Sequence, residues 1–554
     1  MNATASQRRA QHQLIGSRIA ALEEEIRLLK SRQNELAEIS QLPPEILGQI
    51  FVCYRLSCGP RSERYHYHKH ESLDWTKVTH VSRNWRAVAL ACPQLWSIID
   101  AADRRWASVM LDRSNPFPIS FTWNRSLCEW HASLEKDIAN KVLSQSHRLE
   151  CLEIDNTLTV FNTLVTQLTA PTPVLRRLKL RTRATDFDKE HDIPLPTGFL
   201  GNNASQLRHL ELTSFVVPWH AISFKNLRTL KLSRSTSTSP FHPEPEPFFK
   251  AIAEMEDLRC LHLFDAGLPI APLPTKRIIS LHRLETFTLK GSQRECENVL
   301  KHLAIPASAT LDIWCHTTAD DRLSSVSDLV SAATSSWLSS PLSNSVAPSP
   351  VKSLAFDRYE RAKIYLQAVV NFKNPGLGIY IKDCRDDTAP WTSDLVSALP
   401  SDKIEMLGLS TSMPEMTLAV LSQLPRLHTV CIDSAATKFC RYIAADPAIQ
   451  GQKPREPFEK APVATGATAE KLPPTPLTRF LSLTTLICSR VDFRRDISVA
   501  DFEKLLMLRS EKGRPLRSLR LEGCLGLRRP EVDRLAKVVD HVEGTGNHYY
   551  DSDS

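Results

Sequence analysis

The residues best suited to chemistry lie in one short stretch near the N-terminus. Two cysteines with the spacing Cys-x4-Cys precede three alternating histidines: Cys53, Cys58, His66, His68 and His70. Thiolates and imidazoles are good zinc ligands. Cys53 falls within a predicted helix, however, and no second close pair of ligands completes a tetrahedral site. A solvated loop is therefore the default interpretation, and we predict no metal and no other cofactor.

Other catalytic signatures are missing from the sequence. It contains no HExxH, GxSxG, GxGxxG or GxxxxGK[ST] pattern, and its 17 glycines are few beside 36 prolines. The single cysteines Cys151, Cys260 and Cys431 lie at predicted strand positions, which is typical of small packing residues. We expect a protein that is not an enzyme. A zinc-dependent enzyme is a remote alternative, and it would require stoichiometric metal.

Composition narrows the class of protein further. Of 554 residues, 42% are hydrophobic, which excludes wholesale disorder. The 69 basic residues exceed the 62 acidic ones too slightly to predict nucleic-acid binding. There is no secretory signal, no apolar run near the ~20 residues that span a bilayer, and no CxxC among 13 scattered cysteines. These features predict a cytoplasmic or nuclear protein that does not bind membranes.

An N-terminal coiled-coil helix is predicted over residues 1–39. Apolar or tolerant residues recur at spacings of 4 and 3, with Ile19, Ile26 and Gln33 at heptad position a and Ile15, Leu22, Leu29 and Leu36 at d. Ile at a with Leu at d favours a parallel two-stranded coil. Two interpretations stay open: a homodimer through residues 15–36, or a single helix that folds back on the next domain.

A small helical domain is predicted over residues 40–100. Proline in the first turn begins a helix with an apolar stripe at Ile46, Leu47, Ile50, Phe51 and Tyr54. After a His-rich loop over residues 57–74, a second stripe runs through Val78, Val81, Trp85 and Val88, followed by Leu95, Trp96 and Ile98.

From residue 149 onward the sequence repeats the pattern LxxLxL, as in Leu175-Leu178-Leu180 and Leu207-Leu210-Leu212. The mean spacing of about 33 residues exceeds that of regular leucine-rich repeats, so the array is irregular. We predict an α/β fold with an irregular leucine-rich-repeat solenoid over residues 101–540. Insertions are expected near 234–247, 324–350 and 447–476, and a flexible tail over 541–554.

The residue between the last two leucines of each unit should point out of the concave sheet. These positions and their neighbours form a charged stripe of mixed sign, suited to gripping a protein. The candidate target-binding residues are Arg177, Lys179, Arg181, His209, Glu211, Lys231, His262 and Arg520. Most of them are merely solvated in the alternative interpretation, and the cations at 177, 179 and 181 are also suited to a phosphate.

Three blocks carry a family resemblance: Leu42-Pro43-Pro44-Glu45-Ile46-Leu47, Val81-Ser82-Arg83-Asn84-Trp85-Arg86 and Pro93-Gln94-Leu95-Trp96. They resemble an F-box-like domain, similar to fungal F-box-like proteins with degenerate leucine-rich repeats. The resemblance covers about residues 40–98. It implies that a Skp-type adaptor is bound through Leu42, Pro43, Ile46, Leu47, Ile50 and Phe51. It also implies that the block with Val81 and Trp85 lies mainly in the domain core and only partly on the contact face.

Together these features predict the substrate-recognition subunit of a cullin–RING ubiquitin ligase, with the helical domain on the adaptor and the repeats on a target protein. A helix with this much apolar surface in so small a domain is typical of a partner site. The alternative is a leucine-rich-repeat interaction scaffold with no ligase association.

Overall fold

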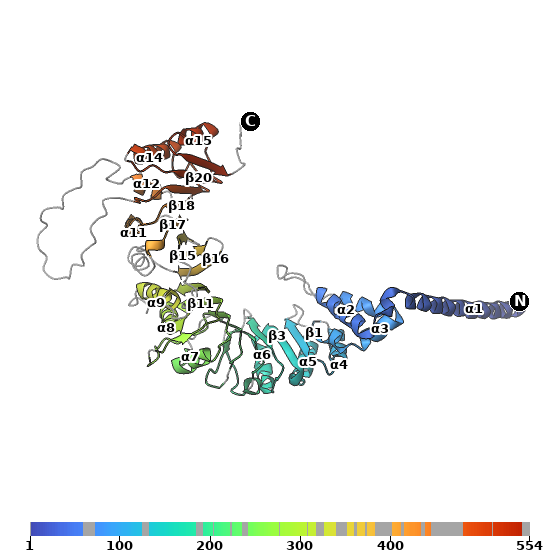
Figure 1. Ribbon diagram of the computed structural model, residues 1–554. Coiled ribbons are helices and arrows are strands. Elements are labelled where there is room, and N and C mark those ends of the chain that lie inside the picture. Colours follow the sequence, from blue (N-terminus) through green and yellow to red (C-terminus); the bar gives the residue numbers. More distant parts are fainter. Residues whose placement is uncertain are drawn as a thin grey trace. The chain divides into compact units, whose positions relative to one another are not determined.

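A computed structural model of the chain describes most of its residues (Figure 1). The described ranges are 2–58, 73–102, 104–124, 132–183, 192–202, 204–221, 224–234, 242–275, 277–306, 308–316, 326–338, 352–358, 363–371, 374–382, 401–410, 415–433, 438–444, 480–511 and 513–545. The chain divides into two units, Met1–Phe224 and Lys225–Ser554. Each unit is described by itself.

The first unit begins with helices. They are α1 (Asn2–Glu35), η1 (Glu38–Gln41), α2 (Pro44–Ser57), η2 (Leu73–His80), α3 (Arg83–Leu90) and η3 (Pro93–Trp96). The second predicted helix is split into η2 and α3 because Ser82 caps α3: its hydroxyl accepts a hydrogen bond from the Trp85 amide at 3.1 Å. Most of the predicted His-rich loop, residues 59–72, lies outside the described residues.

An aromatic cluster forms the core of this helical domain. Trp75 meets Trp96 edge to face with ring centroids 5.0 Å apart, and Trp106 stacks on Trp96 at 6.3 Å. The buried guanidinium of Arg55 lies 4.3 Å from the Trp75 ring centroid and donates hydrogen bonds to the carbonyls of Leu95 and Ile98. One side chain of α2 therefore joins the helical domain to the strand that follows it.

The strands of the first unit form a parallel sheet in the order β1-β2-β3-β4-β6. Their bounds are β1 (Ile98–Asp100), β2 (Ile119–Asn124), β3 (Leu149–Thr157), β4 (Arg177–Arg183) and β6 (His209–Thr213), and a small second sheet pairs β5 (Ile193–Pro194) with β7 (Phe215–Val216). The connections carry α4 (Arg104–Arg113), α5 (Ala132–Leu143), η5 (Ser146–Arg148), α6 (Leu158–Leu164), η6 (Val165–Thr169) and η7 (Phe199–Asn202).

The strands of the sheet thus begin at residue 98, close to the start predicted for the repeats at 101 and well before the first LxxLxL unit at 149. The strand β2 buries Ile119, Phe121 and Trp123 on one face. This is a simple alternation of apolar residues without the leading LxxL, so the repeat pattern did not reveal it.

The second unit continues in the strand order β8-β9-β11-β13-β16-β15-β14-β17-β18-β19-β20-β21. All neighbours are parallel except β15, which is antiparallel to β14 and β16. The bounds are β8 (Thr229–Ser233), β9 (Cys260–Phe264), β11 (Thr286–Ser292), β13 (Thr310–His316), β14 (Ser353–Arg358), β15 (Lys363–Asn371), β16 (Asn374–Lys382), β17 (Met406–Leu409), β18 (Thr429–Asp433), β19 (Thr485–Ser489), β20 (Ser518–Glu522) and β21 (His541–Thr545); a separate pair joins β10 (Ile279–Ser280) to β12 (Leu303–Ala304).

The helices of this unit are α7 (Pro245–Ala253), α8 (Gln293–Lys301), α9 (Val326–Leu338), η10 (Ser401–Lys403), α11 (Glu415–Leu421), α12 (Lys438–Ala444), α14 (Val499–Glu511) and α15 (Arg529–Leu535). Two elements fall within segments that were expected to be an insertion and a tail. The helix α9 occupies much of the expected insertion at 324–350 because its Leu329, Val330 and Trp337 are buried, and β21 occupies the start of the expected flexible tail. The expected insertion at 447–476 lies outside the described residues.

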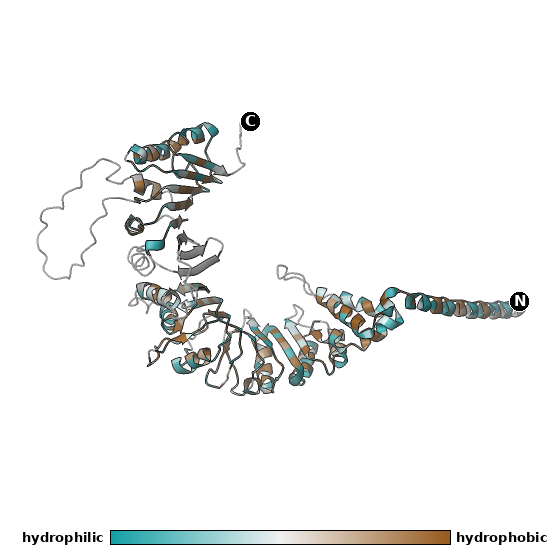
Figure 2. Ribbon diagram, in the orientation of Figure 1, coloured by the Kyte–Doolittle hydropathy of each residue, from teal (hydrophilic) through white to brown (hydrophobic). Residues whose placement is uncertain are grey.

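The repeated leucines lie in register and form the core. Leu152, Leu178 and Leu210 are direct neighbours on β3, β4 and β6, and each is at most 1% exposed. Residues between them remain partly exposed, and Figure 2 shows hydrophobic and hydrophilic residues alternating along these strands. The α/β class is confirmed, with large parallel sheets. Within the described residues, no helix is both long and apolar enough to cross a bilayer.

A row of polar side chains on α8 holds the preceding loop. The Glu295 carboxylate accepts a hydrogen bond from the Leu268 amide at 2.8 Å. The buried Asn298 amide donates to the carbonyls of Pro269 and Ala271 at 2.8 and 2.9 Å. Further along, the amide of Leu273 donates to His302 Nε2 at 3.2 Å. These hydrogen bonds hold the proline-rich loop over residues 268–273 against one face of the helix.

Candidate binding surfaces

The first candidate surface is an apolar row on α2, which we call the head patch: Ile46, Ile50 and Tyr54 together with Pro43. The three helical residues are 50%, 40% and 39% exposed. They recur every four residues and therefore lie along one side of the helix. Pro44 at the first helical turn fixes where this row begins. The row offers large apolar side chains that no described part of the chain covers.

The six positions that the resemblance assigns to adaptor contact divide into two groups. Ile46, Ile50 and Pro43 are exposed, and Leu42 is partly exposed. Leu47 and Phe51 are buried, at 0% and 1% exposure. These two therefore belong to the core that supports the patch.

The second family block also divides. Trp85 packs against Phe51 with ring centroids 5.0 Å apart, which fits the expected place in the core. Val81 is 55% exposed, so it lies outside the core and belongs to the part of this block that faces outward. It lies in the turn between η2 and α3, just before the capping residue Ser82.

The second candidate surface is the exposed face of the sheet in the first unit. There Glu153, Lys179 and Glu211 form one row across β3, β4 and β6. The Glu211 carboxylate lies within ion-pair distance of three side chains: Lys179 Nζ at 3.5 Å, Arg181 Nη2 at 3.2 Å and His209 Nε2 at 3.9 Å. Two of the three cations suited to a phosphate are therefore already paired with a carboxylate.

Arg177, the third of these cations, is exposed and lies beside Cys151 and His209 in the adjacent row. Burial raises the pKa of Cys151 to about 12, and it raises the pKa of Cys431 to about 11. These thiols stay protonated at neutral pH and are poor nucleophiles. Their properties fit packing residues.

The exposed face of the second unit forms a third candidate surface. Lys231, His262, Thr288 and Asp312 lie in register across β8, β9, β11 and β13. Thr288 is buried, whereas the other three are partly exposed. Burial raises the pKa of Asp312.

The next row of the same face was not anticipated as a binding surface. Phe264, Lys290 and Trp314 are partly exposed neighbours on β9, β11 and β13. The rings of Phe264 and His262 stack with centroids 5.9 Å apart, and Lys290 Nζ lies 2.6 Å from Asp265 Oδ2. Aromatic residues such as Trp and Phe are enriched at the centres of protein interfaces, with charged residues toward the rim. The alternation in Leu311-Asp312-Ile313-Trp314 is the sequence signal that could have revealed this face.

Arg520, the last candidate residue, lies near the C-terminal edge of the sheet. Its Nε is 2.8 Å from Glu543 Oε2, and His541 Nε2 is 3.2 Å from the other oxygen of that carboxylate. The hydrogen bond from His541 and the charge of Arg520 lower the pKa of Glu543. Arg520 thus helps to hold β20 and β21 together.

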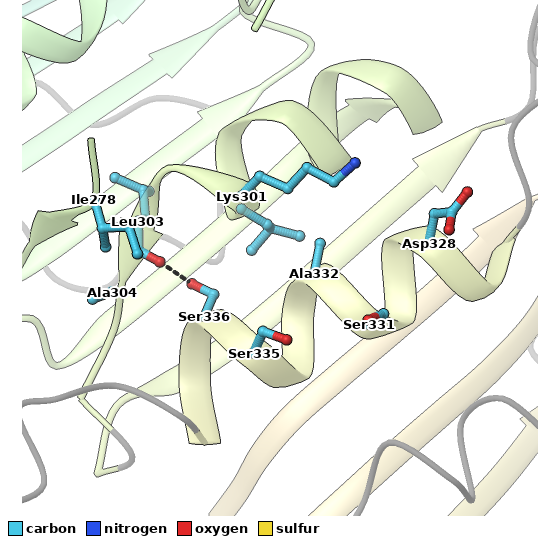
Figure 3. Close-up of a pocket in the computed structure, with 10 residues that line it drawn as sticks. Ile278, Lys301, Leu303, Ala304, Asp328, Ser331, Ala332, Ser335 and Ser336 are labelled. Carbon is cyan, nitrogen blue, oxygen red and sulfur yellow. Dashed lines mark hydrogen bonds between the residues drawn. The ribbon is translucent and has the colours of Figure 1, made fainter. Parts of the chain in front are cut away.

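One pocket of about 260 Å³ lies between α8, β12 and α9 (Figure 3). Ile278, Leu300, Leu303, Ala304 and Ala332 form its apolar part, and Lys301, Asp328, Ser331, Ser335 and Ser336 its polar part. The Ser336 hydroxyl donates to the Leu303 carbonyl at 2.6 Å, and Lys301 pairs with Glu297. The first bond joins α9 to β12 and the second stays within α8. We assign no ligand to the pocket.

Among the described residues, no group of three or more His, Cys, Asp or Glu side chains could hold a metal ion. The histidines of the zinc hypothesis lie outside those residues. No protein-family model matches the chain, and no curated protein shows significant similarity to it. The surfaces described above are therefore the basis for a functional proposal.

Proposed function

We propose that this chain is the substrate-recognition subunit of a cullin–RING ubiquitin ligase of the Skp–cullin–F-box type. In this proposal the F-box-like domain, residues 40–100, binds the Skp-type adaptor. An irregular leucine-rich-repeat solenoid, residues 101–540, binds the target. The chain supplies proximity: holding a target near the ligase raises the local concentration of its lysines.

The head patch carries this proposal. Ile46 and Ile50 are exposed on a helix whose other face, through Leu47 and Phe51, is fixed in the core. Such a patch is preorganised because its helix is already ordered before a partner arrives. Three of its residues, Pro43, Ile46 and Ile50, are positions that the resemblance assigns to adaptor contact.

Two features support the role of the repeats. The parallel strands bury their leucines in register and leave partly exposed residues on the other face. On the second unit this face combines Trp314 and Phe264 with Lys290, a combination suited to gripping a protein surface.

Co-purification of the full chain with a Skp-type adaptor tests the proposal. The double substitution Ile46→Asp with Ile50→Asp should weaken adaptor binding by at least about tenfold, because burying two isoleucines contributes several kcal/mol. Both residues are exposed, so the fold should be retained. Leu47 is unsuitable for this test because it is fully buried.

Leu56→Asp is the matched control. Leu56 is 62% exposed on the same helix but lies off the row of Ile46, Ile50 and Tyr54. It should leave adaptor binding unchanged. If the wild-type chain fails to bind the adaptor, the scaffold alternative without a ligase replaces the proposal. If the double variant binds the adaptor as well as wild type, the head patch is not the adaptor site and the observation that carries the proposal is lost.

A further inference from the structure

The helix α1 carries a row of exposed apolar side chains along one side. Ile15, Ile19, Leu22, Ile26 and Leu29 are each between 42% and 56% exposed. They follow spacings of 4, 3, 4 and 3 residues, which places them on one face of a helix. No described part of the chain folds back over this face. A 34-residue helix with such a face is typically stabilised by packing against a partner.

We propose that α1 pairs with α1 of a second copy of this chain, in parallel and in register, as a two-stranded coiled coil. The seam consists of Ile19, Ile26 and Gln33 at position a and Ile15, Leu22 and Leu29 at position d. Leu36 lies just past the end of the helix. Branched residues at a with leucine at d favour two strands over three or four.

Charge complementarity supports a second copy of this chain as the partner of α1. In a parallel, in-register pair, position g of one helix faces position e of the next heptad on the other. Arg18 then faces Glu23 of the second copy, and Glu25 faces Lys30. Each contact occurs twice because the pair is symmetric. All four contacts are between opposite charges.

The polar residue in the seam selects the orientation. In the parallel pair Gln33 lies opposite Gln33 of the second copy, so the two amides can hydrogen-bond. In an antiparallel pair, a residues face d residues, and the amide would lie against leucine or isoleucine without a partner. An unpaired buried amide costs about 1–3 kcal/mol. The parallel arrangement avoids this cost.

Pairing through α1 would bring together two helical domains and two sets of repeats. A partner with two binding sites would then be held more tightly than by one copy, through effective concentration. This inference does not rest on the ligase proposal, because neither the seam nor its charges belong to the head patch.

Light scattering of the full chain across a dilution series tests the pairing. Wild type should have about twice the mass of a 62.4 kDa chain. Ile19→Lys with Ile26→Lys should reduce it to the single-chain mass. The matched control, Leu14→Lys with Leu28→Lys, adds the same charge at apolar residues that are 71% and 50% exposed but lie outside the seam. The control should remain a dimer.

Oxidative crosslinking tests the orientation. Gln33→Cys should form a disulfide-linked dimer under mild oxidation, since position a meets itself only in a parallel, in-register coil. Ser31→Cys, on the outer side of the helix, should crosslink no more than wild type. A single-chain mass for wild type, equal dissociation by the seam and control variants, or no added crosslinking at Gln33→Cys would each overturn the proposal.

Discussion

At the residue scale, the carboxylates on the exposed faces of the sheets differ in their surroundings. Glu211 is surrounded by Lys179, Arg181 and His209, so most of its charge is balanced within the chain. Asp312 is different, because burial alone raises its pKa. A carboxylate in such a place destabilises the folded chain and is suited to a cation on a partner.

Asp312→Asn should therefore raise the urea midpoint at neutral pH. The folded pKa of Asp312 lies above its ordinary value of 3.8, so ionisation removes stability as the pH rises through the interval between the two. The amide side chain of the Asp312→Asn variant does not ionise, so the variant does not lose this stability. Its advantage over wild type should disappear below about pH 3.8, where both chains carry a neutral group. An advantage that persists unchanged in acid would contradict this explanation.

Residue types predicted some positions well and others poorly. The leucines of LxxLxL are buried as expected because a strand must place alternate residues on one face. Among the family-implied contacts, the sequence did not separate the exposed Ile46 from the buried Leu47. Both are apolar and adjacent, and only the packing of α2 against Trp85 and its neighbours distinguishes them.

At the element scale, local polar bonds set boundaries that hydrophobic periodicity missed. Ser82 divides the second predicted helix because its hydroxyl caps α3. The strands β1 and β2 escaped the repeat pattern because they lack its leading leucines. The row of Glu295, Asn298 and His302 on α8 shows spacings of three and four residues, but its partner is a backbone segment that leaves no pattern of its own.

Asn298→Ala should loosen the loop that this row holds. Two buried hydrogen bonds are lost, and the carbonyls of Pro269 and Ala271 are left unsatisfied, at a cost of about 2 kcal/mol. Amide hydrogen exchange should accelerate near Leu268 and Leu273. The exposed change Lys301→Ala on the same helix should have little effect, because the ion pair of Lys301 with Glu297 stays within that helix. Unaltered exchange in Asn298→Ala would show that the other contacts suffice.

At the scale of the whole molecule, each strand pairs mainly with its immediate neighbours. Leu407, Val430, Leu486 and Leu519 continue one buried row through β17, β18, β19 and β20. In such an array stability is nearly a sum of local terms, so damage should remain local. The sequence predicted the α/β class because the LxxLxL pattern recurs. It did not predict β15, whose antiparallel pairing breaks the repeat.

Leu486→Ala should cost about 3 kcal/mol, since the side chain is fully buried. Exchange should accelerate in β18, β19 and β20, while β3, β4 and β6 of the first unit retain wild-type rates. Equal acceleration in both units would instead indicate that the entire chain unfolds cooperatively.

The hydrogen bonds from Arg55 to the carbonyls of Leu95 and Ile98 affect how the helical domain of the first unit is held against the sheet. They connect α2, the helix that carries the exposed isoleucines, directly to β1, the first strand of the sheet. Under the proposed function, a target protein bound to that sheet would keep a fixed orientation relative to the adaptor bound to the head patch. Together with the stacking of Trp106 on Trp96, these bonds would fix the orientation of the helical domain relative to the start of the sheet.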